Sequence, residues 1–341
     1  MIDLRSDTVT KPTPEMREAM ARAEVGDDVW GEDPTVIRLQ ETAAEMLGME
    51  AGLFVASGTM GNQVCLCAQT QRGEEFIAHA DAHIVQHEAG AYAVISGLVP
   101  KLLPGVHGAL DPEAVEAAIN PDDVHKPRTS LVCLENTHNA SGGCCLTVEQ
   151  VRSVAEAAHH HGLKLHLDGA RIFNAATHLG VPAKALVAGA DSVQFCLSKG
   201  LGAPVGSLVV GSREFVARAR RVRKMLGGGM RQAGVLAAVG ILCLEKSIHR
   251  LHEDHAHARM IAACLARHAG VTIDLATVQT NIIRFSFQRE DLDVPALAAA
   301  LHERGIRMDG RRPPHVRLVT HHDVSAADTE AVVQALDEIL S

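Results

Sequence analysis

The length of 341 residues and a hydrophobic content of 47% allow one large buried core and a smaller domain. A formal net charge of −9 argues against a nucleic-acid-binding surface. Because neither a long apolar run nor an apolar N-terminal segment is present, we expect a soluble protein of the cytoplasm, without a membrane anchor or an export signal.

The first 30 residues have the composition of an extended arm. Polar side chains are too frequent between Arg5 and Thr10 for a core strand. Prolines at positions 12 and 14 favour extended backbone before a helix near Pro14–Ala23. We therefore expect this arm to lie over a site or a subunit contact. Trp30, the only tryptophan, falls in a loop as an aromatic anchor.

A strand, a turn of small residues and a helix follow one another around residue 57. Helical spacing of apolar residues from Val36 to Leu47 precedes a strand at Gly52–Ala56. The turn Ser57-Gly58-Thr59-Met60-Gly61-Asn62 then opens a helix that runs to about Gln71. Such a turn can direct free backbone N–H groups and the positive end of a helix at a phosphate. An ordinary strand-to-helix turn has the same composition, so this stretch alone does not establish a phosphate site.

The middle of the chain alternates short strands with helices up to residue 160. A polar cluster, Glu135-Asn136-Thr137-His138-Asn139, stands at the end of a buried strand, Ser130–Glu135. His125 lies in a turn. The other elements that we expect here are a strand at Phe76–Ala78, a helix that carries His83 over Ala82–Glu88, short strands at Val94–Ile95 and Leu102–Leu103, and helices at Asp111–Ile119 and Thr147–His160.

Two buried strands lead to charged residues that together indicate a chemistry. The apolar run Leu163–Asp168 ends in Asp168, and the run Ala190–Leu197 leads into a turn of small residues that carries Lys199. Ligands of open α/β sheets bind outside the carboxyl ends of the strands, so both side chains could face one crevice. A partly desolvated lysine favours its neutral amine, which attacks carbonyl groups. A fixed carboxylate and an imine-forming lysine are what pyridoxal phosphate requires, although Lys199 alone would be as well explained as a loop lysine in water.

The rest of the chain continues the alternation and contains a separable, smaller part. A strand at Gly206–Val210 follows Lys199, and long helices from Glu214 to about His268 are broken at Gly227–Gln232. The alternation predicts an α/β fold with a mostly parallel sheet and helical crossovers. From about residue 270 the expected elements are a strand at Ile282–Phe287, a helix at Val294–Arg304, a strand at Val316–Thr320 and a helix at Ala326–Leu340.

The cysteines and histidines do not form the pattern of a metal centre. The eight cysteines lie mostly in apolar runs without paired zinc-type spacing, which indicates buried, reduced thiols. The run His159–His161 closes a helix, where histidines favour the dipole. Histidines 252, 255 and 257 lie on a long polar helix without a second ligand pair. We expect surface histidines there and assign no transition metal.

Seven motifs occur in the order in which one known family carries them. They are Leu4–Thr10, Ser57–Thr59, Glu135–Asn139, Asp168–Asn174, Leu197–Leu201, Gly227–Gln232 and Val316–His321. By these motifs the chain resembles, over nearly its whole length, the low-specificity L-threonine aldolases, which are fold type I pyridoxal-phosphate enzymes. The resemblance implies an α/β fold of the aspartate aminotransferase type, made of an N-terminal arm (1–30), a large cofactor-binding domain (31–250) with a seven-stranded, mostly parallel sheet, and a small C-terminal α/β domain (251–341).

The resemblance also implies which residues bind pyridoxal 5′-phosphate. Lys199 would hold the cofactor covalently, Asp168 would pair with its pyridinium nitrogen, and His83 would lie against its ring. Arg171 belongs to the same cofactor-binding set. The phosphate would be bound by Ser57, Gly58 and Thr59 from the helix N-terminus and by Arg231 from a neighbouring subunit.

A second set of positions would bind the substrate. Its carboxylate would be held by Ser6, Arg171 and Arg317, a task that suits guanidinium groups. His83 would lie near its hydroxyl group. Trp30 stands where many relatives carry a tyrosine beside the active site, and the larger ring would still form that wall.

The implied reaction is the reversible cleavage of L-threonine, L-allo-threonine and related L-β-hydroxy-α-amino acids to glycine and an aldehyde. The bond perpendicular to the cofactor ring breaks, and a carboxylate clamped by Arg171 and Arg317 would place Cα–Cβ in that position. The β-hydroxyl proton would go to His83 or His125, directly or through a water molecule, because an imidazole titrates near the working pH. His125 is also explained by an ordinary loop position.

Two alternative functions can be weighed against the same sequence features. A different pyridoxal-phosphate reaction on this scaffold, catalysed by a β-eliminating lyase, a transaldolase or an aminotransferase, is the alternative, because a fold does not fix a reaction. A cofactor-free binding protein is disfavoured by the presence of Lys199 with Asp168.

The resemblance implies a homotetramer, a dimer of dimers whose sites are shared between subunits through Arg231. No nucleic acid or membrane partner is expected.

Overall fold

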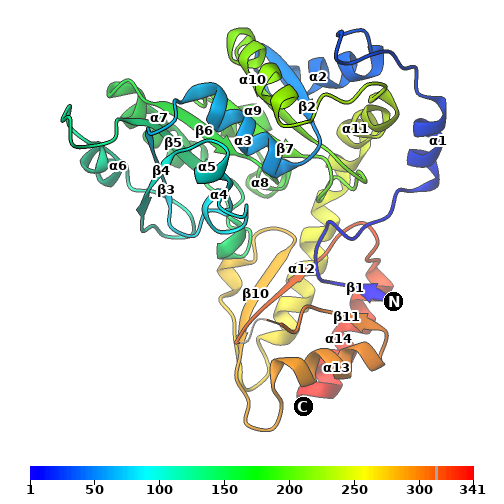
Figure 1. The fold of residues 1–341 in the computed structure, drawn as a ribbon. Helices are drawn as coiled ribbons and strands as arrows, with labels where there is room; N and C mark the ends of the chain where they lie inside the picture. The colour runs from blue at the N-terminus through cyan, green and yellow to red at the C-terminus, as the bar shows by residue number, and fades with distance from the viewer. Residues whose placement is uncertain (312–313) are drawn as a thin grey trace.

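A seven-stranded sheet forms the centre of the larger part of the molecule in the computed structural model, which describes residues 1–311 and 314–341 (Figure 1). The strand order is β2-β8-β7-β6-β5-β3-β4, and β8 alone runs antiparallel to its neighbours. The predicted mostly parallel sheet is therefore confirmed. The strands are β2 (Ala51–Val55), β3 (Glu75–His79), β4 (Val99–Leu103), β5 (Thr129–Glu135), β6 (Lys164–Asp168), β7 (Ser192–Cys196) and β8 (Ser207–Gly211).

Helices cover both faces of this sheet, because its strands carry apolar side chains on both sides. Leu208 and Val210 of β8 pack into the main core, whereas Val209 between them packs with Phe215 on the opposite face. The helices of this part are α1 (Pro14–Arg22), α2 (Pro34–Leu47), α3 (Gly58–Gln69), α4 (His83–Gln86), α5 (Ala91–Val94), α6 (Pro112–Ala118), α7 (Val148–His160), α8 (Ile172–Leu179), α9 (Ala183–Leu186), α10 (Arg213–Met225) and α11 (Gly234–Lys246).

Side-chain caps fix the helix starts that the sequence predicted. The carboxylate of Asp111 accepts a hydrogen bond from the backbone N–H of Glu113, and Pro112 occupies the first position of α6. Thr147 and Gln150 cap α7 reciprocally, each side chain accepting from the other residue's backbone N–H. Caps of this kind each stabilise a helix by about 1 kcal/mol.

Residues 91–94 form a short helix, so the expected strand at Val94–Ile95 is wrong. Gly90 adopts a left-handed conformation with φ of 72°, which turns the chain directly into α5. Val94 is 77% exposed. A sheet position would have buried this apolar pair, and nothing buries Val94 here.

A second, smaller core lies beside the sheet and includes the start of the chain (Figure 1). Strand β1 (Ile2–Asp3) pairs in parallel with β11 (Ile306–Arg307), and Leu4 is buried in this core. The N-terminal arm is thus fastened to the C-terminal part of the chain. The other elements are α12 (Leu251–Leu265), β9 (Val271–Thr272), β10 (Ile282–Phe287), α13 (Val294–Glu303), β12 (His315–Val319) and α14 (Ala326–Leu340), with β9, β10 and β12 in one antiparallel sheet.

Burial of single residues bears on three further expectations. His255 on α12 is buried rather than on the surface, because α12 packs against α8 and Asn174 Nδ2 donates to His255 Nε2 at 3.1 Å. All eight cysteines are free thiols, and most of them are buried. Throughout the described ranges, no helix has both the length and the apolar character that crossing a bilayer would require.

Candidate active site

Neighbouring strands bring Asp168 and Lys199, two of the predicted catalytic residues, to one edge of the sheet. Glu135 at the end of β5 is level with Asp168 at the end of β6, and Asp168 is level with Gln194 in β7. Lys199 follows β7 in the next turn. A cavity of about 580 Å³ lies at this edge, and its lining includes Ser6, His83, Arg171, Lys199 and Arg317.

Asp168 is a buried carboxylate held by amide donors. Its Oδ1 accepts from Gln194 Nε2 and from the backbone N–H of Ala170, both at 3.0 Å, and its Oδ2 accepts from Asn62 Nδ2 at 2.8 Å. Burial raises the pKa of Asp168, but the nearby charges of His83 and Lys199 and the donated hydrogen bonds outweigh it, so the net shift of this pKa is downward. The carboxylate is therefore ionised and fixed in direction.

His83 begins the one-turn helix α4 and is held at two points. Its backbone N–H donates to Glu135 Oε2 at 2.6 Å, and its ring Nδ1 pairs with Glu88 Oε1 at 3.0 Å. Burial lowers the pKa of His83, but the hydrogen bond that its Nδ1 donates to Glu88 and the charges of Asp168 and Glu135 outweigh burial, so the net shift of this pKa is upward. Burial and the neighbouring Asp168 shift the pKa of Glu135 upward as well.

The turn after β2 has the geometry of an anion site. Ser57 caps α3, its Oγ accepting from the backbone N–H of Met60 at 3.2 Å. The N–H groups of the first helical turn, including those of Gly58 and Thr59, have no acceptor within the helix. A Cβ added at Gly58 would lie 2.9 Å from Cys196 Sγ, so glycine is required for the close approach of this turn to β7.

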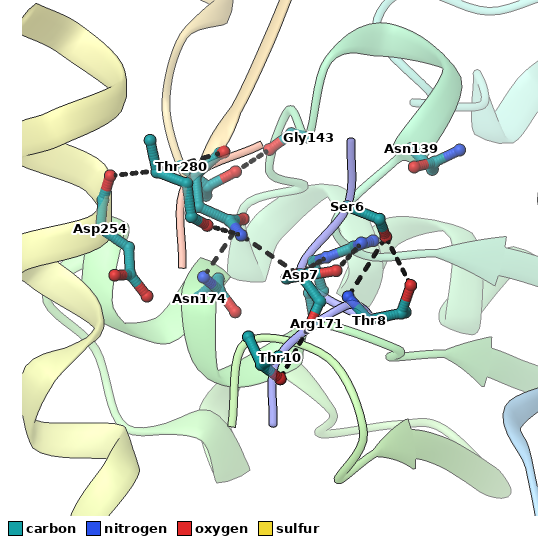
Figure 2. Close-up of polar contacts among 12 residues, drawn as sticks. Ser6, Asp7, Thr8, Thr10, Asn139, Gly143, Arg171, Asn174, Asp254 and Thr280 are labelled. Carbon is teal, nitrogen blue, oxygen red and sulfur yellow. Dashed lines mark hydrogen bonds and ion pairs between the residues drawn. The ribbon is translucent and has the colours of Figure 1, made fainter. Parts of the chain in front are cut away.

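The N-terminal arm reaches the same region and holds Arg171 (Figure 2). Asp7 accepts from Arg171 Nε at its Oδ2 and from Nη2 at its Oδ1, both at 2.7 Å, and both side chains are buried. Asn281 Nδ2 donates to Asp7 Oδ2 at 3.1 Å. The bidentate face of Arg171 is thus occupied by Asp7, which leaves Arg171 Nη1 as the atom that can turn toward a ligand.

Ser6 and Arg317 line the same cavity as Arg171. Arg317 projects from β12, and its Nη1 donates to Asn139 Oδ1 at 2.9 Å while its Nη2 donates to the carbonyl of Arg5 at 3.2 Å. Ser6 Oγ contacts Thr8 Oγ1 at 2.8 Å. The arm, the polar cluster after β5 and the small core therefore each supply one side of the cavity.

Asp168 and the Ser57–Thr59 turn are not among the lining residues of this cavity, and three more of the predicted site residues lie at the surface and outside it. The His125 side chain is 86% exposed, and its Nδ1 pairs with Asp123 Oδ1 at 2.9 Å. Trp30 is 75% exposed. Arg231 Nη1 donates to Asp27 Oδ2 at 2.9 Å, and the backbone N–H of Asp28 donates to the carbonyl of Arg231. Trp30 and Arg231 thus lie on adjoining segments at the surface of this chain.

Sequence reasoning missed the buried polar residues that support the site. Asn62, Glu88 and Gln194 are buried and contact Asp168 or His83, and Asp7 is buried against Arg171. One signal was available in the strand Ser192–Cys196, where a glutamine stands inside an apolar run. A buried polar side chain needs partners, so such a position points to a polar neighbour.

The donor set fits pyridoxal 5′-phosphate. A buried, ionised carboxylate stands at one strand end, a lysine follows the next strand, and a helix N-terminus with free N–H groups opens nearby. These are the partners of a ring nitrogen, an aldehyde and a phosphate respectively.

Comparison with known proteins agrees with the geometry. A family model described as "Beta-eliminating lyase" matches residues 3–288. The chain is 46% identical to a low-specificity L-threonine aldolase of Arabidopsis thaliana, covering 99% of this chain and 96% of the relative, and 46% identical to that of Escherichia coli K12, covering 95% of each. A solved threonine aldolase structure from Leishmania major has a TM-score of 0.85 at 20% identity over the full length of both chains, which confirms the predicted fold type I architecture. The chain therefore belongs to the β-eliminating lyase family and, within it, to the group of the low-specificity L-threonine aldolases.

Proposed function

We propose that this protein uses pyridoxal phosphate to cleave L-threonine, L-allo-threonine and related L-β-hydroxy-α-amino acids reversibly to glycine and an aldehyde. One observation carries the proposal: Lys199 and His83 line a single cavity with Arg317, next to the buried carboxylate of Asp168. The names of the relatives that are 46% identical over nearly the full chain support the choice of reaction.

The cofactor supplies, when bound, an electron-accepting ring that stabilises the negative charge left at the substrate Cα. Lys199 would hold its aldehyde carbon, and Asp168 would face its ring nitrogen as an ionised carboxylate fixed by amide donors. The first turn of α3, with Ser57, Gly58 and Thr59, would hold its phosphate.

Orientation of the substrate decides which bond breaks. Arg317 and Ser6 line the cavity and bind the substrate carboxylate, with Nη1 of Arg171 as a third donor. A carboxylate held at this position leaves the Cα–Cβ bond free to stand perpendicular to the cofactor ring, the orientation in which it breaks. Holding reacting groups in place lowers the activation free energy by several kcal/mol.

His83 is the residue that accepts the β-hydroxyl proton, directly or through a water molecule. It lines the cavity, and an imidazole moves a proton efficiently near neutral pH. His125 is exposed on a separate loop. It can take part only if an assembly carries that loop to the cavity of a neighbouring subunit.

Product analysis tests the proposed reaction. With L-threonine and added pyridoxal phosphate, glycine and acetaldehyde are expected in a one-to-one ratio, and no ammonia. Release of ammonia with a keto acid would instead identify a β-elimination, and transfer of the amino group to an added keto acid would identify an aminotransferase.

Replacing Arg317 by lysine is expected to weaken substrate binding. A lysine cannot reproduce the planar guanidinium that bridges Asn139 and the Arg5 carbonyl while facing the cavity. Loss of one charge-assisted hydrogen bond costs about 1.5–3 kcal/mol, so kcat/KM for L-threonine should fall roughly 10- to 150-fold, mostly through KM. Arg304→Lys, at the exposed end of α13, is the matched control and should leave both constants unchanged. An unchanged KM in Arg317→Lys would contradict the carboxylate role.

We further propose a homotetramer, a dimer of dimers, in which Arg231 and Trp30 serve the site of a neighbouring subunit. Both residues lie at the surface of this chain and are not among the lining residues of its own cavity. An arginine and an aromatic ring that lie outside the cavity lining of their own subunit are suited to a contact between copies.

Mixing two inactive variants tests site sharing. Lys199→Ala and Arg231→Ala protomers, denatured and refolded together, should regain activity, because each heterodimer contains one site with both residues intact. Refolding each variant alone gives the baseline. If the mixture is no more active than that baseline although heterodimers form, Arg231 acts within its own subunit or not at all.

A further inference from the structure

A continuous chain of buried polar groups connects His83 to Asp168. Asn62 Nδ2 donates to Glu88 Oε1 at 2.7 Å and to Asp168 Oδ2 at 2.8 Å. Glu88 Oε1 also pairs with His83 Nδ1 at 3.0 Å, and Gln63 Nε2 donates to Glu88 Oε2 at 3.2 Å. The Glu88 side chain has no exposed surface.

The donors and acceptors of this chain are fixed by elimination. The amide nitrogen of Asn62 donates one hydrogen to Glu88 and one to Asp168, so its Oδ1 must accept. The partner of Oδ1 is His166 Nε2 at 3.1 Å, which therefore carries the proton. Burial lowers the pKa of His166 to about 4, so this ring is neutral. An ionised carboxylate can only accept, so Glu88 accepts from His83, and His83 Nδ1 is the protonated nitrogen.

We propose that Glu88 is a positioning residue for the reaction: it holds His83 through Nδ1, so that Nε2 is the nitrogen that exchanges a proton in the cavity, and Asn62 ties this pair to Asp168. The proposal rests on the proposed aldol cleavage. It adds that the proton acceptor and the carboxylate that binds the cofactor ring belong to one hydrogen-bonded unit, so that disturbing Glu88 changes the protonation of His83.

The charges around His83 give the sign of the expected change. Glu88, Asp168 from β6 and Glu135 from β5 face it as carboxylates, Lys199 faces it as a cation, and the His87 ring lies 5.5 Å from its ring centroid. Removing the Glu88 charge takes away the main contribution that raises the pKa of His83. In Glu88→Gln, His83 should therefore lose its proton at a lower pH, and the acid limb of kcat/KM should move to lower pH.

Two readouts on the full-length enzyme test this proposal. The first is the NMR titration of histidines labelled with carbon-13 at Cε1, with the His83 signal assigned by its loss in His83→Asn. The second is the pH dependence of kcat/KM for L-threonine. In Glu88→Gln the His83 titration and the acid limb should shift to lower pH together, and kcat should fall about 10- to 100-fold with little change in KM.

Matched variants keep the outcome interpretable. Glu116→Gln removes a carboxylate that pairs with His161 at 3.4 Å on the surface, and it should leave His83 and the rate profile unchanged. Glu88→Asp keeps the charge on a shorter side chain, so the acid limb of kcat/KM should stay at the wild-type pH while kcat falls. This variant also tests the orienting role if Glu88→Gln does not fold.

Several outcomes would overturn the proposal. In folded Glu88→Gln, an unchanged His83 titration would show that Glu88 does not control this ring, and a shifted titration with an unchanged rate profile would show that the control does not serve the reaction. Full kcat in Glu88→Asp would contradict the orienting role. The NMR titration needs no substrate, so it tests the His83–Glu88 pairing independently of the reaction. A wild-type enzyme that fails to cleave threonine would refute the proposed function alone.

Discussion

Replacing Lys199 with alanine is expected to lower kcat by about 10⁴- to 10⁶-fold, the range seen when the group that forms a covalent bond to the substrate or cofactor is removed. Among the described residues that line the cavity, Lys199 is the one lysine. The measurement is the turnover of L-threonine together with the visible absorbance of the cofactor-loaded protein, which should lose the band of covalently bound cofactor.

Lys164→Ala is the matched control for this substitution. Lys164 lies at the other end of β6, more than half exposed, where it pairs with Asp191 at 2.9 Å. Its removal should leave turnover and absorbance unchanged. An active Lys199→Ala enzyme with the wild-type spectrum would mean that another lysine carries the cofactor.

Replacing Asp7 with asparagine is expected to destabilise the fold by about 3–5 kcal/mol, because it leaves the buried Arg171 guanidinium without its counter-charge. The Asp7–Arg171 pair is bidentate and shut off from solvent, so water cannot replace the lost partner. Equilibrium unfolding in urea measures the loss. Asp3→Asn on the same arm removes a partner of the half-exposed Arg5 and should cost at most about 1 kcal/mol.

The pH dependence of stability gives Asp7 a second signature. Burial raises the pKa of Asp7, but the charge and hydrogen bonds of Arg171 outweigh it and hold this pKa well below its usual range. A carboxyl group with a lowered folded-state pKa contributes stability above its unfolded pKa of about 3.9, and this stability is lost as pH falls from there toward the folded pKa. Asp7→Asn should therefore lose the part of the acid dependence below about pH 4 that the wild type shows. Equal stability and equal acid dependence in both proteins would contradict the assignment of Asp7.

The positions of Asp168 and Lys199 could be predicted because each follows a short apolar run. Strands buried on both faces have continuous apolar sequences, and in a parallel sheet their carboxyl ends meet at one edge. Ser57 was found for a similar reason, since a strand, a small-residue turn and a helix occur in immediate succession. Each of these signals lies within a short stretch of sequence, so it can be read without knowing the contacts between distant residues.

The partners that hold these residues could not be predicted, since they depend on contacts between distant parts of the chain. Asp7 and Arg171 are 164 residues apart, and Asn62 and Asp168 are 106 apart. Neither pairing has a spacing that marks it. The strand expected at Val94–Ile95 failed because a left-handed Gly90 changed the local path. His125, Trp30 and Arg231 lie at the surface of one chain, where a role depends on a neighbouring copy.

Mass mapping of the borohydride-reduced enzyme tests most directly whether Lys199 carries the cofactor. Borohydride makes the bond between a lysine and pyridoxal phosphate permanent, so after digestion the added mass marks the lysine that held it. The expected result is a single modified peptide containing Lys199, absent when Lys199→Ala is treated in the same way. A modified peptide that contains a different lysine, in a protein that cleaves threonine, would contradict the account of this site.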